Sequence, residues 1–140
     1  MSAAMIAALV FTVALLVTTA YFVMGSIPLL VLKHDTPLDA RFVRGFFNTY
    51  YVAAFVSATA TSISFALAGR AGLAAGAAVL ALIALGLRQK VIPKMDSLGA
   101  EIQSNAMDAI PGFRRTHIAA ILFNVVQLVA IVWSLTTLGR

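Results

Sequence analysis

Four long stretches without a charged side chain constrain the fold of this chain more than any other feature. They cover residues 3–32, 45–69, 71–87 and 118–139, with lengths of 30, 25, 17 and 22 residues. A helix needs about 20 apolar residues to cross the hydrocarbon core of a bilayer. The chain is 61% hydrophobic and 11% charged, against about 45–50% and 25% in soluble domains, so the sequence predicts four membrane-spanning helices.

These helices are expected to form an all-α, up-down-up-down bundle, a single integral membrane domain over residues 1–140. The predicted helices cover about 3–32, 37–68, 71–92 and 111–138. The first stretch has no basic start and is longer than the apolar part of a signal peptide, so we expect it to remain as a helix. Pro28 is predicted to kink or end this helix.

The signals that start the second helix are local. Thr36 suits the capping position, Pro37 the first helical position, and Asp39 the position from which an acid reaches the free N–H groups. Gly69 to Gly72 predicts a tight turn, which would make the second and third helices an antiparallel hairpin.

Residues 89–116 are polar, with apolar residues recurring at about helical spacing. Two structures satisfy that pattern. One is a short amphipathic segment lying on the cytoplasmic surface between the third and fourth helices. The other is a prolongation of the third helix that breaks at Pro93.

The charge is distributed unevenly along the chain. Threading four helices puts eight basic residues on one side and only Arg70 and Arg140 on the other; the eight are Lys33, Arg41, Arg44, Arg88, Lys90, Lys94, Arg114 and Arg115. The positive-inside rule then places both charged loops in the cytoplasm and both termini outside it, most simply in the cytoplasmic membrane of a bacterium. Membrane orientation accounts for the net charge of +5, so nucleic-acid binding is not expected.

The fourth helix carries polar groups where an apolar helix should have none. His117, Asn124 and Gln127 are separated by seven and three residues, so they lie along one stripe of the helix. An amide buried without partners costs about 2–7 kcal/mol. These side chains must therefore face polar groups or a hydrated cavity inside the bundle.

The second helix offers matching groups, because Arg44, Asn48 and Tyr51 share a face by their i, i+4 and i+7 spacing. Together with Arg115, they predict a cytoplasm-facing ligand pocket between the second and fourth helices. Thr18 and Tyr21 of the first helix lie at intermediate depth and would close it. The alternative is that Asn48, Asn124 and Gln127 bond to one another and only fix the register of the bundle.

The two histidines also leave alternatives open. His34 and His117 both fall on the predicted cytoplasmic side. No H-E-x-x-H or E-x-x-H pair predicts a metal site, and the chain has no cysteine, so no metal or cofactor is predicted. Joint ligation of a haem or metal by His34 and His117 is geometrically open, as is a general-base role for His117.

The third helix is rich in small residues, and Gly72 and Gly76 form a GxxxG spacing. Such a face lets two backbones approach closely. It serves either packing inside this bundle or contact with a protein partner or a second copy of the chain.

Four short segments carry a resemblance to known proteins: GSIPLLV, DARFVRGFFNTYY, VIPKMDSLGAEI and FRRTHIAAILFNVVQL. They resemble small four-helix integral membrane proteins of unknown function, a group that includes the anthrone-oxygenase-like family. That family oxidises a fused aromatic compound with molecular oxygen and no evident cofactor. The resemblance implies that His117 is the candidate catalytic base.

Two functions follow as expectations. The first is a small integral membrane protein that binds, and in the oxygenase-like case oxidises, a small apolar or aromatic molecule in the pocket. Arg44, Arg115 and His117 would receive its polar end, and Asn48, Tyr51, Asn124 and Gln127 would orient it. The alternative is a non-catalytic accessory subunit of a larger membrane complex. It would be surrounded by membrane lipids and would contact its partners through the third helix and the cytoplasmic segment 89–116.

Overall fold

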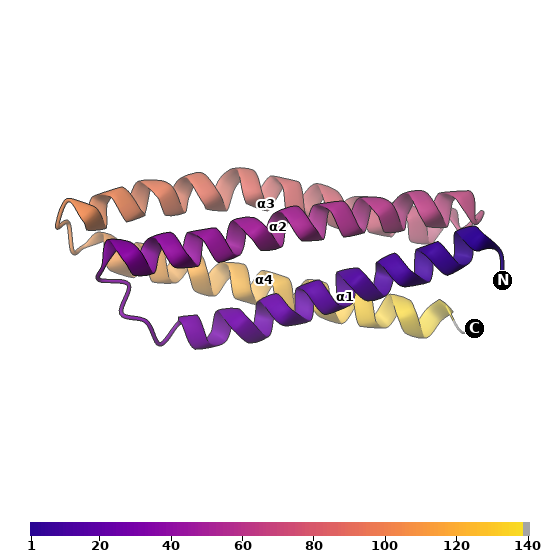
Figure 1. Ribbon diagram of the computed structural model, residues 1–140, viewed down its shortest axis with the longest axis horizontal. Coiled ribbons are helices and arrows are strands. Elements are labelled where there is room, and N and C mark those ends of the chain that lie inside the picture. The colour runs from indigo at the N-terminus through magenta and orange to yellow at the C-terminus, as the bar shows by residue number, and fades with distance from the viewer. Residues whose placement is uncertain (139–140) are drawn as a thin grey trace.

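Four long helices run alternately up and down in the computed structural model, which describes residues 1–138 (Figure 1). They are α1 (Ala3–Leu29), α2 (Pro37–Leu67), α3 (Ala71–Gln103) and α4 (Ala109–Leu138). The two ends of the chain lie at the same end of the bundle (Figure 1). The all-α four-helix bundle predicted from the sequence is confirmed. Arg140, which entered the prediction of orientation, lies outside the described residues.

All four helices are long and apolar enough to cross a membrane. Many large apolar side chains also lie exposed on the outside of the bundle, among them Val10, Val17, Met24, Val56, Leu82, Val126 and Val129. Water would make such a surface unfavourable, whereas acyl chains accept it. The chain is therefore an integral membrane protein.

The residues at the two ends of α2 adopt the conformations predicted from the sequence. The Thr36 hydroxyl accepts a hydrogen bond from the Asp39 backbone N–H at 3.2 Å, and Pro37 occupies the first helical position. At the other end Gly69 has a φ of 73°, a left-handed conformation that glycine adopts without steric cost. The turn it makes folds α2 and α3 into the predicted antiparallel hairpin.

Pro28 ends α1, so this helix stops at Leu29 and does not continue to residue 32. Beyond Pro28 the turn tightens: Leu30 N–H donates to the Ile27 carbonyl at 3.1 Å and Val31 N–H to the Pro28 carbonyl at 3.0 Å. These i to i−3 bonds replace the α-helical pattern. The Ser26 carbonyl consequently receives no hydrogen bond from Leu30.

The prediction that the third helix ends near residue 92 is wrong. Of the two structures open for the following segment, the prolongation of the third helix is present, but without the predicted break at Pro93. α3 continues through Pro93 to Gln103, and α4 begins at Ala109, two residues earlier than predicted. Proline removes one helical hydrogen bond. Burial of Met95 and Ile102 in the core offsets that loss, so the segment prolongs the bundle and does not lie on the membrane surface.

The helices pack as a square in which α2 and α4 occupy opposite corners. α1 and α3 each lie beside both α2 and α4, whereas α2 and α4 share no backbone contact. Only long side chains reach across this diagonal. The predicted pocket walls therefore face each other through the centre of the bundle.

The core face of α1 alternates steps of four and three residues: Ala8, Thr12, Leu15, Thr19, Phe22 and Ser26. This spacing is typical of helices that pack with a left-handed crossing. Three of the six are hydroxyl residues, and each donates to the carbonyl four residues earlier, at 2.6–2.8 Å. The bond satisfies the hydroxyl within its own helix, so a polar side chain is tolerated in the core.

Gly72 and Gly76 do not act as close contacts between helices within the described chain. A Cβ atom added at either position would meet no atom within 4 Å. Both line a cavity of about 180 Å³ at the end of the bundle that holds the chain termini. Contact with a partner or a second copy through these glycines stays a prediction.

Candidate functional site

The buried amides of α4 meet a tyrosine of α2 in the centre of the bundle. The Tyr50 hydroxyl donates to Asn124 Oδ1, and Gln127 Oε1 lies 3.4 Å from the same hydroxyl. Asn124 Nδ2 in turn donates to the Ala120 carbonyl at 2.7 Å. The stripe predicted on the fourth helix does face the core, and its polar partner is Tyr50, which our sequence analysis did not single out.

The ring of Tyr50 belongs to a stack of aromatic side chains. Phe22 of α1 packs face to face against Tyr50, with ring centroids 4.0 Å apart, and against Phe46, at 5.5 Å. Phe47 meets the edge of the Phe22 ring at 4.7 Å. Aromatic pairs at such distances contribute about 0.5–1.5 kcal/mol beyond the area that they bury. The stack joins α1 to α2.

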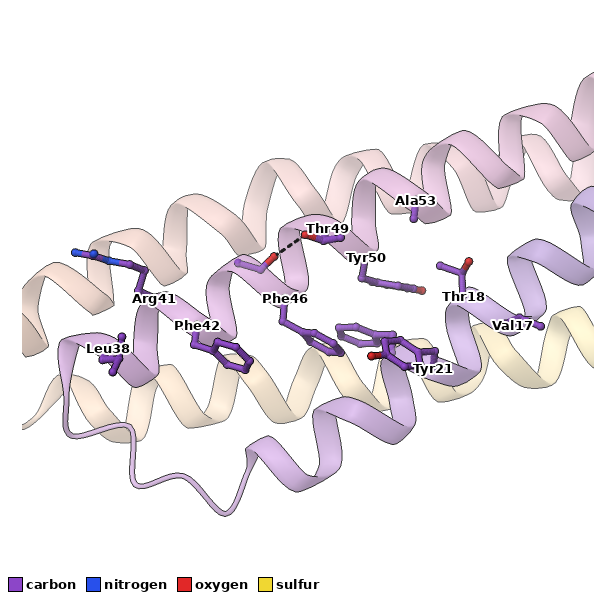
Figure 2. Close-up of a pocket in the computed structure, with 12 residues that line it drawn as sticks. Val17, Thr18, Tyr21, Leu38, Arg41, Phe42, Phe46, Thr49, Tyr50 and Ala53 are labelled. Atoms are coloured by element: carbon purple, nitrogen blue, oxygen red, sulfur yellow. Dashed lines mark hydrogen bonds between the residues drawn. The ribbon is translucent and has the colours of Figure 1, made fainter.

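An open groove of about 880 Å³ runs along the outside of this stack, between α1 and α2. Its lining is largely apolar and aromatic: Val17, Thr18, Tyr21, Phe22, Leu38, Arg41, Phe42, Gly45, Phe46, Thr49, Tyr50 and Ala53. Figure 2 shows Phe42, Phe46 and Tyr50 following one another along α2, opposite Tyr21 and Thr18 of α1. Thr18 and Tyr21 were predicted to close a pocket, and they line this groove.

The groove and the buried amides are connected through one residue. Tyr50 places its ring in the wall of the groove (Figure 2). Its hydroxyl reaches Asn124 and Gln127 of α4 on the far side. A molecule lying in the groove would touch the ring of Tyr50. The amides would hold that ring in place without contacting the molecule themselves.

The two histidines come together near the connection of α1 and α2. The rings of His34 and His117 are fully buried, and their centroids lie 5.6 Å apart with the rings nearly perpendicular. None of their four ring nitrogens makes a hydrogen bond among the described residues. Phe113 packs 5.4 Å from His34 and Phe47 packs 5.0 Å from His117, so aromatic rings cover the pair.

His34 reaches this position because its backbone adopts the left-handed region, with a φ of 58°. Histidine is among the few residues other than glycine that are enriched there. Burial lowers the pKa of His34, and the neighbouring Arg114 lowers it further, whereas Asp39 and Asp35 act in the opposite direction. The ring is thereby favoured in its neutral form.

Two of the predicted ligand-binding residues are used by α3. Arg44 forms a two-point ion pair with Asp96, with Nε to Oδ1 at 2.8 Å and Nη2 to Oδ2 at 3.1 Å. Asn48 accepts a hydrogen bond from Arg88 Nε at 3.0 Å. Neither side chain meets Asn124 or Gln127, so the network in which Asn48 bonds to those amides is not present in the described structure.

Tyr51 and Arg115 lie in different surroundings. Tyr51 is fully buried, close to the Asn124 side chain, and its hydroxyl makes no hydrogen bond among the described residues. Arg115 is exposed on α4, at a second groove between α3 and α4. The structure therefore brings together Tyr51, Asn124, Gln127 and His117 in the core, but not Arg44, Asn48 or Arg115.

The histidine pair is the feature most suited to hold a metal. Imidazole side chains suit zinc, copper or iron, although residues 1–138 contain no cluster of three or more His, Cys, Asp or Glu side chains. Haem ligation by His34 and His117 stays a prediction. A porphyrin at this point would require Phe47 and Phe113 to move.

Tyr50 was missed because the i, i+4 and i+7 spacing from Arg44 selects Tyr51 and not its neighbour. A better signal is the spacing of the buried residues of α2, which include Val43, Phe47, Tyr50 and Ala54. These positions are separated by four, three and four residues, and this places Tyr50 on the core face.

Comparison with known proteins adds no relative to this description. The chain matches no protein-family model, no curated protein and no solved structure.

Proposed function

We propose that this integral membrane protein binds a small, largely apolar molecule with aromatic character in the groove between α1 and α2. The observation that carries the proposal is the position of Tyr50, whose ring lines the groove while its hydroxyl is held by Asn124. Placing an amide in a membrane interior is costly. Orienting a ligand-contacting ring would repay that cost.

The groove has the size and lining that such a ligand needs. Small-molecule sites in proteins occupy about 300–1,000 Å³ and are mainly apolar, with a few polar groups that orient the ligand. The cavity measures about 880 Å³. Phe42, Phe46 and Tyr50 present aromatic surface along one wall, and the hydroxyl groups of Thr18 and Tyr21 lie on the other.

The ligand would therefore lie between α1 and α2, and not in the space between α2 and α4 that was expected from the sequence. Side chains of Phe22, Phe47, Tyr50 and Tyr51, all buried, fill the bundle at the depth of Asn124. The amides then act through Tyr50. Of the ligand-binding residues expected from the sequence, Asn124 and Gln127 keep a role, as residues that position Tyr50.

The proposed orientation follows the positive-inside rule. The end of the bundle with the α1–α2 and α3–α4 connections carries most of the basic residues, so it faces the cytoplasm in this proposal. Both termini then lie outside, and a bacterial cytoplasmic membrane is the setting. Arg41, at the end of the groove nearest the α1–α2 connection, would lie near the cytoplasmic headgroups.

Oxidation of the bound molecule with His117 as the base would be an additional step after binding. His117 is fully buried and does not line the groove. A substrate would reach it only if Phe47 moved, because that ring packs against His117. Binding in the groove therefore comes first, and activity with an aromatic substrate and oxygen is a separate test.

The second candidate function is an accessory subunit of a larger membrane complex. It is favoured by the small-residue face of α3, where Gly72 and Gly76 are exposed and contact no other helix closely. Stoichiometric protein partners that co-purify with the full chain, and are lost from a Gly72→Leu/Gly76→Leu variant, would support this function.

A matched pair of glycine variants tests the groove. Gly45 lines the groove and Gly86 on α3 lines none of the described cavities, while a Cβ atom at either position meets no atom within 4 Å. Native mass spectrometry of the protein purified from membranes should reveal a bound apolar molecule in the wild type and in Gly86→Phe. Gly45→Phe should lose it.

The proposal is overturned if Gly45→Phe keeps the same bound molecules as Gly86→Phe. It is equally overturned if the wild type carries only bulk phospholipid in membrane proportions. Thermal unfolding of both variants in the same detergent checks that the bundle is intact.

A further inference from the structure

A second groove lies on the opposite side of the bundle, between α3 and α4. It has a volume of about 360 Å³ and shares no lining residue with the groove between α1 and α2; its lining is Leu87, Lys90, Val91, Lys94, Arg115, Thr116, Ala119, Ala120 and Phe123. Lys94 and Arg115 lie toward the end of the groove nearest the α3–α4 connection, and Lys90 lies one turn further along α3. Apart from Thr116, the remaining lining residues are apolar. This is an amphipathic site in a membrane-spanning bundle.

The three cations are unpaired within the described part of the chain. Lys90, Lys94 and Arg115 are exposed and form no ion pair with a carboxylate in residues 1–138, where Arg44–Asp96 is the pair that meets ion-pair distance. Lys90 and Lys94 are four residues apart, so they project from one face of α3. Arg115 approaches from α4.

Beyond Arg115 and Thr116, the residues of α4 that line the groove are apolar. Ala119 and Phe123 lie four and eight residues beyond Arg115 on α4, about 6 and 12 Å further along the helix. On α3, Val91 and Leu87 line the other wall. The Ala119 and Ala120 side chains are small, so they fill little of the groove that they line.

We infer that this groove is a binding site for an anionic phospholipid. The phosphate lies against Lys90, Lys94 and Arg115, and one acyl chain lies on Ala119, Ala120 and Phe123. Basic pockets between transmembrane helices on the cytoplasmic side select anionic head groups in this way. A free phosphate ion would use the cations but gain nothing from the apolar floor.

The test compares lipids on the full-length protein in detergent. Native mass spectrometry after addition of phosphatidylglycerol or phosphatidylcholine should show retention of the anionic lipid only. Lys90→Gln/Lys94→Gln should weaken that retention about 25-fold, since each cation near an anionic membrane surface contributes about fivefold. Lys33→Gln/Arg70→Gln, which removes two charges outside the groove, should leave it unchanged.

Two further variants separate a lipid from a free anion. Ala119→Trp keeps all three charges but fills the floor, so it should also abolish retention of phosphatidylglycerol. Lys90→Arg/Lys94→Arg keeps the charge and should retain the lipid. Equal binding of the two lipids by the wild type, unchanged retention in Lys90→Gln/Lys94→Gln, or unchanged retention in Ala119→Trp would each overturn the inference.

Discussion

The Tyr50 hydroxyl donates a hydrogen bond to Asn124 Oδ1 across the diagonal of the bundle. It joins α2 to a helix with which α2 shares no backbone contact. Tyr50 is 5% exposed and Asn124 is fully buried, so water cannot replace either partner. This bond links the lipid-facing groove to the polar stripe of α4.

Removing one partner of this bond should cost more than removing both. Asn124→Leu leaves the Tyr50 hydroxyl buried with only the distant Gln127, and we expect it to lower the free energy of unfolding by about 1 kcal/mol. Tyr50→Phe/Asn124→Leu replaces both groups with apolar ones and should be closer to wild type. Unfolding of the four proteins of this cycle in mixed micelles measures the coupling.

The same cycle tests the role of the amide in binding. Asn124→Leu should lose the bound apolar molecule even though the bundle stays folded, because the ring of Tyr50 is no longer held. Full retention of the molecule in Asn124→Leu would show that the amide serves the bundle alone.

Gly25 leaves room for the ring of Phe46, which lines the groove. A Cβ atom at Gly25 would lie 2.7 Å from Cζ of Phe46, which is the far end of a side chain that can rotate. Gly25→Ala should therefore displace the Phe46 ring and change unfolding stability little, while ligand retention falls several-fold. Titration with an environment-sensitive aromatic probe measures the change. A probe that binds Gly25→Ala and wild type equally would contradict this coupling.

His34 should make stability depend on pH. Burial holds the pKa of His34 in the folded protein below its ordinary value of 6.5, so the unfolded chain takes up a proton first as the pH falls. The contribution of neutral His34 is intact above about pH 6.5 and is lost as the pH drops toward the folded pKa. The stability advantage of wild type over His34→Asn should therefore shrink between pH 7.5 and pH 5.

Asparagine suits this comparison because it tolerates the left-handed backbone of residue 34. Thermal unfolding in detergent at the two pH values gives the difference directly. A gap between the two proteins that stays constant with pH would show that protonation of His34 is not involved.

Membrane orientation can be measured with single cysteine substitutions, because the natural chain contains no cysteine. Met107 is exposed in the α3–α4 connection, and Ala71 is exposed at the opposite end of the bundle. In intact cells, a membrane-impermeant maleimide should label Ala71→Cys but not Met107→Cys. The reverse pattern of labelling would invert the proposed topology.

The sequence by itself determined the class, the number of helices and most of their ends. Charge-free length dictates membrane insertion, and capping at Thr36 and the left-handed glycine at Gly69 act within a few residues. Such local effects do not depend on the rest of the fold. The inward-facing stripe of Asn124 and Gln127 was predictable for the same reason, since lipid offers an amide no partner.

Only the tertiary structure decided which groups meet. Pro93 lies within a helix because Met95 and Ile102 are buried beyond it, and Asn124 bonds to Tyr50 because α2 and α4 occupy opposite corners. Helical spacing assigns a residue to a face but does not say which neighbour that face will touch. That choice depends on how four helices share one core, and it placed the large open groove between α1 and α2.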